Sequence, residues 1–355
     1  MTTLYLNRSF SATSFVLHDL RSKWVHDQLR VVMSHSRIDP YLADSVDLLE
    51  VEPHFDFKTQ EGHEAYIEYL LEQCRVHNAD VFLPRYQATT IAAAHDRFKA
   101  QGVEVILVGD ADLYQLFDDK FSAGRRLEDF GLISSPQSEL VSDYEQFSRA
   151  YQELRHTPLG ISTDREQVCL KPNVGVGGKG FMRIAHRRSE LEDLFRESVH
   201  SISYARLDRV LRDADPFPEL LLSTYLSGVE YSIDCLADRG ELLAAYPRVY
   251  LNKYEQRFDN KPELIEVCRA ICARFKLNYL FNIQVKEHRG AWYFIELNTR
   301  MAAGSHRITT LGVSPLTIAL ELATHRELSS GLEIEWGSIV RRQEIYVHTS
   351  TANMT

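Results

Sequence analysis

Short apolar runs alternate with stretches of helical periodicity along the first 115 residues. Four runs are typical of buried strands: Leu4–Leu6, Leu29–Met33, Asp80–Leu83 and Val103–Val108. Between them, Gly62–Val76 and Ala88–Ala100 carry apolar residues at helical spacing. Strands that alternate with helices at these spacings predict a parallel α/β layer.

The middle of the chain reads differently. Asp112–Gly131 predicts one helix that closes on Gly131. Val168–Ile184 predicts a strand, a glycine-rich turn and a second strand, and Ser189–Val199 predicts a charged helix. The segment Ser201–Pro218 has no clear period.

The last third predicts more strands than helices. Strands are expected at Leu220–Leu222 and Tyr231–Leu236, helices at Pro262–Phe275 and Pro315–His325, and a β-like tail at Ile339–Val347. Leu280–Val285 and Ala291–Leu297 predict a hairpin over the turn Glu287–Gly290.

Composition changes this picture little. The chain has 355 residues, of which 44% are apolar and 25% charged, as in ordinary globular proteins. The formal net charge is −10 and no basic block stands out, so we expect neither nucleic-acid nor membrane binding. Five scattered cysteines favour buried reduced thiols, and the absence of a secretory-signal pattern makes the cytoplasm the default expectation.

The glycine-rich turn is the strongest local signal. Gly175, Gly177 and Gly180 formally satisfy G-x-G-x-x-G, but Phe181–Ile184 alternates like a strand, whereas a dinucleotide fingerprint requires a helix there. What remains is a glycine hairpin whose backbone N–H groups approach phosphate oxygens, with Lys171 at the end of the entering strand. A tight turn packed for its own sake is the alternative.

The second signal lies in the predicted hairpin. Side chains alternate across a strand, so Gln284, Glu296 and Asn298 share one face. The opposite face is apolar and holds Ile283, Val285, Ile295 and Leu297. Three oxygen-bearing side chains together predict a Mg²⁺ site completed by phosphates and waters. The alternative is a polar, solvent-facing side of an antiparallel sheet.

These motifs resemble the ATP-grasp superfamily, and most closely the ATP-grasp halves of carbamoyl phosphate synthetase and single-copy carboxylate–amine ligases. The resemblance extends over nearly the whole chain. It implies an α/β fold (α+β ATP-grasp) with a parallel N-terminal pre-ATP-grasp domain and two α+β lobes that clamp ATP. The implied boundaries are 1–115 for the first domain, 116–218 for the small lobe with the glycine-rich flap, and 219–355 for the C-terminal lobe.

The resemblance also implies roles for individual residues. Lys120, Lys171, Gly177 and Gly178 would contact the ATP phosphates. The hinge that begins at Glu219 and includes Leu222 would bind adenine through its backbone, and Glu230 would hold the ribose hydroxyls. The family usually has an acidic residue seven positions before that glutamate, where this chain has Ser223.

Gln284, Glu296 and Asn298 would bind Mg²⁺, with Mn²⁺ as an alternative. Arg300 would neutralise the transferring phosphoryl group, and Arg307 would bind substrate or the transferred phosphate.

Two further arginines leave alternatives open. Arg248 either presents its charge to a substrate carboxylate or lies on a strand rim. Arg85 sits at the C-terminal end of a strand, where open α/β sheets bind ligands, but a surface arginine is the favoured interpretation.

The implied activity is an ATP-dependent carboxylate–amine ligation through an acyl phosphate, on small-molecule or peptide substrates. One alternative is phosphorylation of a small acid without ligation, as in carbamoyl phosphate synthetase. Another is a nucleotide-binding regulatory protein without turnover. The expected partners are small carboxylate and amine substrates, and homodimers are common in the superfamily.

Overall fold

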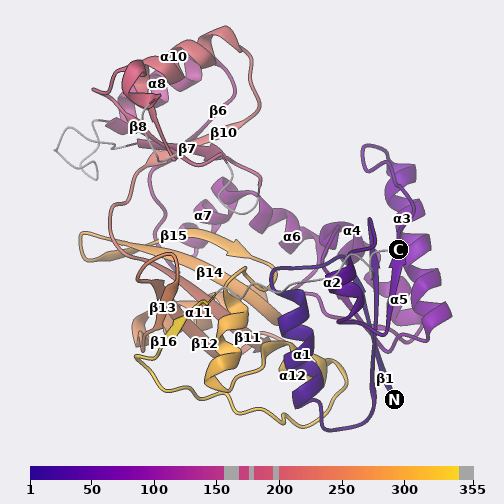
Figure 1. Ribbon diagram of the computed structural model, residues 1–355. Helices are drawn as coiled ribbons and strands as arrows, with labels where there is room; N and C mark the ends of the chain where they lie inside the picture. Colours follow the sequence, from indigo (N-terminus) through magenta and orange to yellow (C-terminus); the bar gives the residue numbers. More distant parts are fainter. Residues whose placement is uncertain (156–167, 176–179, 195–199, 344–355) are drawn as a thin grey trace. The chain divides into compact units, whose positions relative to one another are not determined.

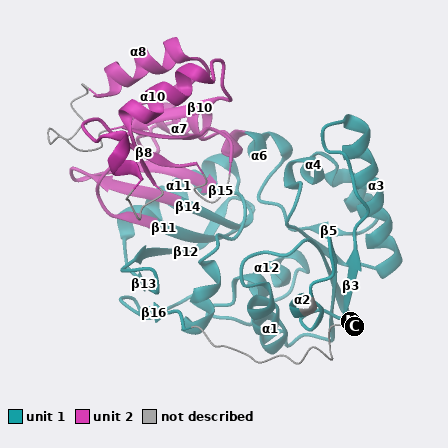
Figure 2. Ribbon diagram, turned by 45° about the horizontal axis from the view of Figure 1, so that its top comes forward, with its two compact units in different colours: residues 1–115, 232–283, 298–355 teal, residues 116–231, 284–297 magenta. Residues whose placement is uncertain are grey.

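The computed structural model describes residues 1–155, 168–175, 180–194 and 200–343. It divides into two compact units, which Figure 2 shows in different colours. Unit 1 comprises Met1–Gln115, Ser232–Ile283 and Asn298–Thr355, and unit 2 comprises Leu116–Tyr231 and Gln284–Leu297. The three-domain boundaries drawn from the sequence stay a prediction.

The N-terminal part of unit 1 is a five-stranded parallel sheet with the order β3-β2-β1-β4-β5. Its strands are β1 (Thr2–Asn7), β2 (Leu29–His35), β3 (Leu48–Val51), β4 (Val81–Pro84) and β5 (Glu104–Val105). Every residue of the central strand β1 is buried. The predicted parallel α/β layer is therefore confirmed. Strand β3 was not predicted, because it is short and its residues are only partly buried.

The helices of this layer are α1 (Thr13–Lys23), α2 (Pro40–Ala43), α3 (Gln60–His77), α4 (Ala88–Ala93) and α5 (His95–Ala100). Helix α1 was not predicted; it starts at Ala12, which has a left-handed backbone and no side-chain cap. The single helix expected over residues 88–100 breaks at Ala94. In unit 1, α1 packs against α12 (Pro315–Ala323), as Figure 1 shows.

The helix predicted over residues 112–131 is two helices, α6 (Ala111–Asp118) and α7 (Lys120–Asp129). The break falls at Asp119, whose side chain accepts a hydrogen bond from the backbone N–H of Ser122 at 2.9 Å. A carboxylate in this position satisfies a free N–H group of the new helix. The prediction was therefore wrong at Asp119, and the consequence is that Lys120 stands in the first turn of α7.

Unit 2 is built on a mixed five-stranded sheet with the order β6-β10-β7-β8-β9. The strands are β6 (Ser138–Val141), β7 (Val168–Pro172), β8 (Met182–Ala185), β9 (Ser201–Ser203) and β10 (Leu220–Thr224). Helices α8 (Tyr144–Arg155) and α10 (Tyr204–Asp213) lie on one face of it (Figure 1), and the short α9 spans Glu190–Asp193.

The core of unit 2 lies under these two helices. Phe147, Tyr151 and Tyr204 stack on one another, with ring centroids 4.5 to 6.4 Å apart. Helix α10 fell in the segment without a clear period, yet Leu207 and Leu211, one turn apart, are both buried in this core. The two strands predicted on either side of the glycine-rich turn are confirmed by the antiparallel pairing of β7 with β8, and residues 176–179 between them lie outside the described residues.

The third sheet has the order β15-β14-β11-β12-β13-β16. Its strands are β11 (Glu230–Asp238), β12 (Glu241–Tyr250), β13 (Glu255–Phe258), β14 (Tyr279–His288), β15 (Ala291–Asn298) and β16 (Ile339–Arg341). Strand β12 was not predicted, whereas the helix α11 (Pro262–Phe275) was. The predicted tail forms β16, and its end lies outside the described residues. Among the described residues, no helix has the length and apolarity needed to cross a membrane.

The hairpin of β14 and β15 is confirmed. Its turn residues Arg289 and Gly290 both have left-handed backbones, with φ of 53° and 80°. Two consecutive positive φ values match the right-handed twist of the flanking strands, which is why asparagine, aspartate or glycine is usual there. The turn therefore fixes the register of the strands that carry Gln284 and Glu296.

We predict that Gly290→Ala lowers the free energy of unfolding by about 1 kcal/mol, because a Cβ disfavours positive φ. No atom lies within 4 Å of the added methyl group, so the effect is conformational. Urea denaturation measures it. Gly331→Ala is the control, since Gly331 has an equally open surrounding without a left-handed φ. Equal effects of the two substitutions would contradict the prediction.

Candidate functional site

Strand alternation gives the sheet of unit 2 one apolar and one polar face. On β7, Val168 and Leu170 belong to the hydrophobic core, so Cys169 and Lys171 point to the opposite face. Lys171 pairs in register with Leu221, and Cys169 with Ser223. The Cys169 Sγ and Ser223 Oγ atoms are 3.2 Å apart. A lysine is thus held in a central strand beside apolar and uncharged neighbours.

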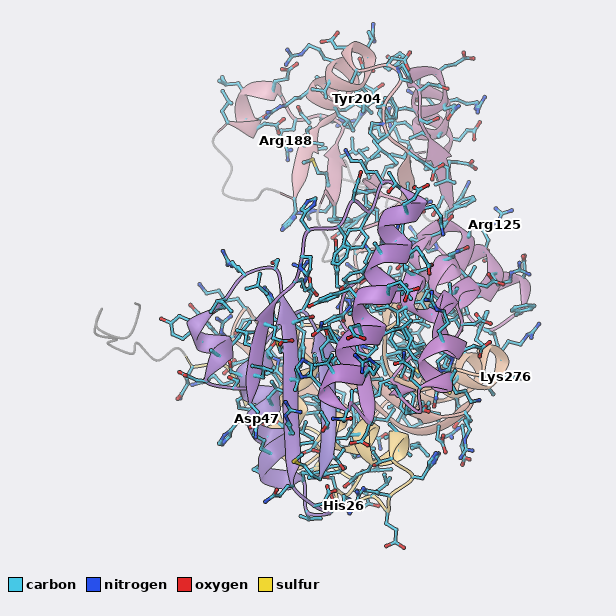
Figure 3. All side chains as sticks on the ribbon, turned by 90° about the vertical axis from the view of Figure 1, so that its right-hand side faces the viewer. His26, Asp47, Arg125, Arg188, Tyr204 and Lys276 are labelled. Carbon is cyan, nitrogen blue, oxygen red and sulfur yellow. The ribbon has the colours of Figure 1, made fainter. Side chains whose placement is uncertain are left out.

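On this face lies a cavity of about 390 Å³ within unit 2. Helix α7 contributes to its wall, and Arg125 of that helix is labelled in Figure 3. The lining residues are Lys120, Phe121, Gly124, Arg125, Glu128, Ser135, Pro136, Gln137, Ser138, Glu139, Lys171, Leu221, Ser223, Phe294 and Ile295. The volume is in the range of small-molecule sites. Within the described part of the chain, the buried Ser135 Oγ has no hydrogen-bond partner, which suits a wall that meets a polar ligand.

Asn173 joins the strand end to the helix start. It is 2% exposed, and its amide donates to Asp119 at 3.1 Å and to Glu219 at 2.9 Å. Its side-chain oxygen accepts from the backbone N–H of Phe121 at 3.1 Å. The ammonium of Lys120 donates to the backbone oxygen of Asn173 at 3.2 Å. Asn173 therefore fixes the start of α7 against the end of β7.

Two lysines share this cavity, and both are largely desolvated. Burial lowers the pKa of Lys120, the Glu296 carboxylate opposes this effect, and the charge of Lys171 adds to it. Burial also lowers the pKa of Lys171, which Cys169 and Glu296 oppose. Glu296 thus acts electrostatically on both ammonium groups. The cavity is lined by three cationic side chains, Lys120, Lys171 and Arg125, and by two carboxylates, Glu128 and Glu139. Such a charged lining suits a phosphate ester that is accompanied by a divalent cation.

The residues expected at the adenine and ribose are dispersed. Glu219 accepts the hydrogen bond from Asn173, and Glu230 is exposed, with its carboxylate 3.5 Å from the ammonium of Lys286. Leu222 is fully buried in the core under α8, and β10 is flanked by β6 and β7. The structure therefore does not bring Leu222 to the cavity. Its neighbours Leu221 and Ser223 line the cavity instead.

Gly177 and Gly178 lie outside the described residues. On either side of them, Gly175 and Gly180 have φ of 155° and 77°. A Cβ on Gly180 would come within 2.8 Å of the ring of Pro172. The flanks of the predicted flap thus require glycine.

The expected metal ligands are distributed along the hairpin. Gln284 and Glu296 belong to unit 2, and Asn298 follows at the end of β15. Among the described residues, no cluster of three or more His, Cys, Asp or Glu side chains forms a metal site. Mg²⁺ commonly binds one or two protein carboxylates together with substrate phosphates. A single carboxylate, Glu296, that acts electrostatically on Lys120 and Lys171 fits that cation.

Arg300 and Arg307 belong to unit 1. The Nη1 atom of Arg307 is buried without a hydrogen-bond partner among the described residues, and its guanidinium lies 5.8 Å from the ring centroid of Tyr250. Burial lowers the pKa of Arg307. Arg300 donates to the backbone oxygen of Met301 at 3.2 Å.

Arg248 does not lie on a strand rim. It is 2% exposed on β12, and its Nε is 2.6 Å from an oxygen of Asp234. Burial opposes its charge, but Asp234 more than compensates and raises the pKa of Arg248. The same carboxylate accepts hydrogen bonds from Asn282 and Ser305. Arg248 is therefore part of an internal ion pair and not available for a substrate carboxylate.

Two features of the cavity wall were missed from the sequence. Asn173 follows Lys171-Pro172 directly, and an amide after a strand-end lysine was the available signal. The segment Ser135–Glu139 carried no local signal, because it reaches the cavity only through the pairing of β6 with β10.

Comparison with known proteins agrees with this architecture. A family model described as "ATP-grasp in the biosynthetic pathway with Ter operon" matches residues 216–345. No curated protein matches the chain. N5-carboxyaminoimidazole synthetase from Staphylococcus aureus, complexed with ADP, superposes with a TM-score of 0.66 at 13% identity over 94% of this chain and 80% of that one.

Two further solved structures are similar. The L-amino acid ligase from Bacillus licheniformis gives a TM-score of 0.61 at 13% identity, covering 91% of this chain and 74% of that one. The biotin carboxylase domain of the Hydrogenobacter thermophilus 2-oxoglutarate carboxylase, with MgADP and bicarbonate, gives 0.62 at 15% identity over 95% and 73%.

The chain therefore has the ATP-grasp fold, as the motifs predicted. Within that fold, the family match covers the part that contains β10, the hairpin of β14 and β15, and α12. The specific likeness to carbamoyl phosphate synthetase stays a prediction.

We predict that Asn173→Ala lowers the free energy of unfolding by about 2 to 4 kcal/mol, because it leaves the Phe121 N–H and two carboxylates without their partner. Urea denaturation measures the loss. Asn252→Ala is the control, since this exposed asparagine also accepts from two backbone N–H groups. A loss at Asn173 no larger than that at Asn252 would contradict the assigned role.

We predict that Lys171→Met stabilises the unliganded protein at pH 7. The pKa of Lys171 is lowered by burial, so between that pKa and the unfolded value of about 10.4 the unfolded chain binds more protons. The free energy of unfolding of wild type therefore rises with pH through this window relative to that of the variant. The stability advantage of the variant narrows accordingly. Urea denaturation at about pH 7 and about pH 10 measures it.

Lys99→Met, at an exposed lysine, is the matched control and should show no such narrowing. A methionine variant that is less stable than wild type at pH 7, with a gap independent of pH, contradicts the prediction.

Proposed function

We propose that this protein is an ATP-dependent carboxylate–amine ligase that acts through an acyl phosphate. The proposal is carried by one observation: Lys120 and Lys171 converge on a single cavity, and the carboxylate of Glu296 acts electrostatically on both. The ATP-grasp fold supports it, and so do the ADP and MgADP bound by two of the similar structures. The expected small carboxylate and amine substrates belong to this proposal.

In this proposal the lysines bind the phosphates of ATP. Both ammonium groups are partly stripped of water, and a charge-assisted hydrogen bond strengthens in such surroundings. The glycine flanks Gly175 and Gly180 let the backbone approach the same oxygens. The orphaned hydroxyl of Ser135 and the side chain of Ser223 line the part of the cavity next to β10.

Glu296, with Gln284 and Asn298 on the same face of the hairpin, would hold Mg²⁺. When bound, such an ion would supply positive charge to the phosphates. The residues of the chain contribute position and electrostatics, because phosphoryl transfer needs little covalent chemistry from a protein. Arg300 and Arg307 are proposed to stabilise the transferring phosphoryl group and the bound substrate.

The balanced reaction has two steps. An oxygen of the substrate carboxylate forms a bond to the γ-phosphorus, and the bond from that phosphorus to the bridging oxygen of ADP breaks. An amine nitrogen then forms a bond to the acyl carbon, orthophosphate leaves with the bonding electrons, and the amine releases a proton. No protein nucleophile is required in either step.

A second reaction on the same site is phosphorylation of a small acid without ligation. It is favoured by the structural likeness to a carboxylase domain that binds bicarbonate. Product analysis separates the two, since ligation yields an amide together with ADP and orthophosphate. A binding protein without turnover would release no ADP with any acid.

We predict that Glu296→Ala abolishes ATP turnover and leaves the fold intact, because the carboxylate next to both lysines is lost. Release of ADP in a screen of paired amino acids and small carboxylates measures turnover, and circular dichroism checks the fold. Glu145→Ala, an exposed carboxylate on α8, is the matched control and should retain wild-type turnover. Wild-type ADP release by the Glu296 variant would refute the proposal.

A further inference from the structure

The N-terminal sheet has a second place where chemistry gathers. Strand β1 lies between β2 and β4, and the chain leaves β1 toward β2 before it returns on the other side to β4. Open α/β sheets bind ligands at such a switch point, outside the carboxyl ends of the strands. Ser9 and Phe10 follow β1 here, and Arg85 follows β4.

A cavity of about 250 Å³ lies at this position, within unit 1. It is lined by Ser9, Phe10, Ser11, Arg85, Arg300, Met301, Ala302 and His306. Its volume is slightly below the range of sites for drug-sized ligands, which begins near 300 Å³. The lining has two guanidinium groups and two serines, and this composition suits a small polar ligand.

Arg85 is fixed in place without a partner for its charge. Its backbone N–H donates to the side-chain oxygen of the buried Asn7 at 2.6 Å. Its guanidinium lies over the ring of Phe10, 4.7 Å from the centroid. Its Nε is buried and has no hydrogen-bond partner among the described residues. Arg85 is thus not the ordinary surface arginine expected from the sequence.

Two other arginines of unit 1 are neutralised by carboxylates, and Arg85 differs from them in this respect. Arg8 has its Nε 2.6 Å from a carboxylate oxygen of Glu52, and Arg248 is equally close to Asp234. No carboxylate of the described residues pairs with Arg85 or with Arg300. Burial and, to a smaller extent, the like charge of Arg300 lower the pKa of Arg85 to about 10, so the side chain stays protonated at pH 7.

The loop that follows Arg300 is held in place by the structure beneath it. Ser305 donates a hydrogen bond to Asp234, and a Cβ on Gly304 would come within 2.6 Å of Nη1 of Arg248. The Arg248–Asp234 ion pair therefore packs directly under this loop. Arg85 and Arg300 are therefore held at one cavity, and no carboxylate of the described residues neutralises either charge.

We propose that this cavity is an oxyanion subsite, in which Arg85 and Arg300 bind the carboxylate or phosphate group of a small acidic ligand. A planar guanidinium can donate two parallel hydrogen bonds to such a group. A bound anion would also supply an acceptor for the Nε atom of Arg85, which has no partner among the described residues. The inference rests on the proposed function only where it calls this ligand the acid substrate. It then assigns the substrate to the class of small acids whose anionic group Arg85 and Arg300 hold.

The test is isothermal titration calorimetry of the full chain with malonate and, separately, with orthophosphate. Wild type should bind at least one of them at a single site, and Arg85→Gln should weaken that binding about 10- to 100-fold. Tighter binding of malonate assigns the site to a carboxylate, and tighter binding of orthophosphate to a phosphate. No binding of either anion by wild type overturns the proposal.

Three further variants make the result specific. Arg37→Gln, which removes an exposed arginine of the same domain, should bind as wild type does. Arg85→Lys keeps the charge without the planar fork and should bind at an intermediate strength. Lys171→Met removes a lysine of the proposed phosphate cavity in unit 2 and therefore reports any anion that binds there. Loss of the anion in Lys171→Met but not in Arg85→Gln places it in the other cavity and overturns the proposal.

A structural role for Arg85 is tested by urea denaturation. Removal of an unpaired, desolvated charge should leave the midpoint of Arg85→Gln at or above that of wild type. A clearly lower midpoint would mean that Arg85 has a stabilising partner, and the proposal would be wrong. Unchanged ADP release by Glu296→Ala refutes the proposed ligase while leaving this anion site intact, so the two failures are distinguishable.

Discussion

Desolvation of the two cavity lysines is the constraint on which the candidate site of unit 2 depends. Strand alternation places Lys171 on the face opposite a hydrophobic core, and the sheet neighbours on both sides keep it there. Lys120 reaches the same cavity because Asp119 breaks the helix in front of it and Asn173 holds the new helix start. A buried ammonium is unfavourable unless an anion accompanies it. Glu296 supplies part of that compensation, and a polyphosphate would supply the rest.

The same principle separates the arginines of unit 1 into two groups. The partly buried Arg8 and the buried Arg248 pair with carboxylates, where they order a strand end and the loop before η1 (Ser305–Leu311). Arg85 and Arg300 have no such carboxylate partner within the part of the chain that the structure describes. Natural proteins rarely leave a desolvated charge uncompensated, and functional sites are the usual exception. In unit 1, the paired arginines Arg8 and Arg248 therefore stabilise the structure, and the proposed ligand binding falls to Arg85 and Arg300.

Local sequence patterns predicted what depends on local physics. The turn at Gly290 and the strand pair around Gly175 needed only periodicity and backbone preferences. Helix α10 and strand β3 were not predicted, because their apolar faces are short and become recognisable only once they pack against a sheet. The break at Asp119 escaped because one capping hydrogen bond outweighed an unbroken apolar period. Asn173 escaped because its value lies in contacts with residues 46 and 54 positions away.

Leu222 shows the difference between a backbone role and a side-chain role. The hinge motif predicts a contact of its backbone with adenine, which stays a prediction, whereas its side chain follows strand alternation, in which a shift of one residue exchanges the two faces. Leu222 consequently points into the core, and Leu221 and Ser223 point to the cavity. At 13 to 15% identity to the similar structures, the fold persists because many strand pairings share its stabilisation. A site residue has no such redundancy, so its role must be argued from burial and contacts in this chain, as it is for Arg85.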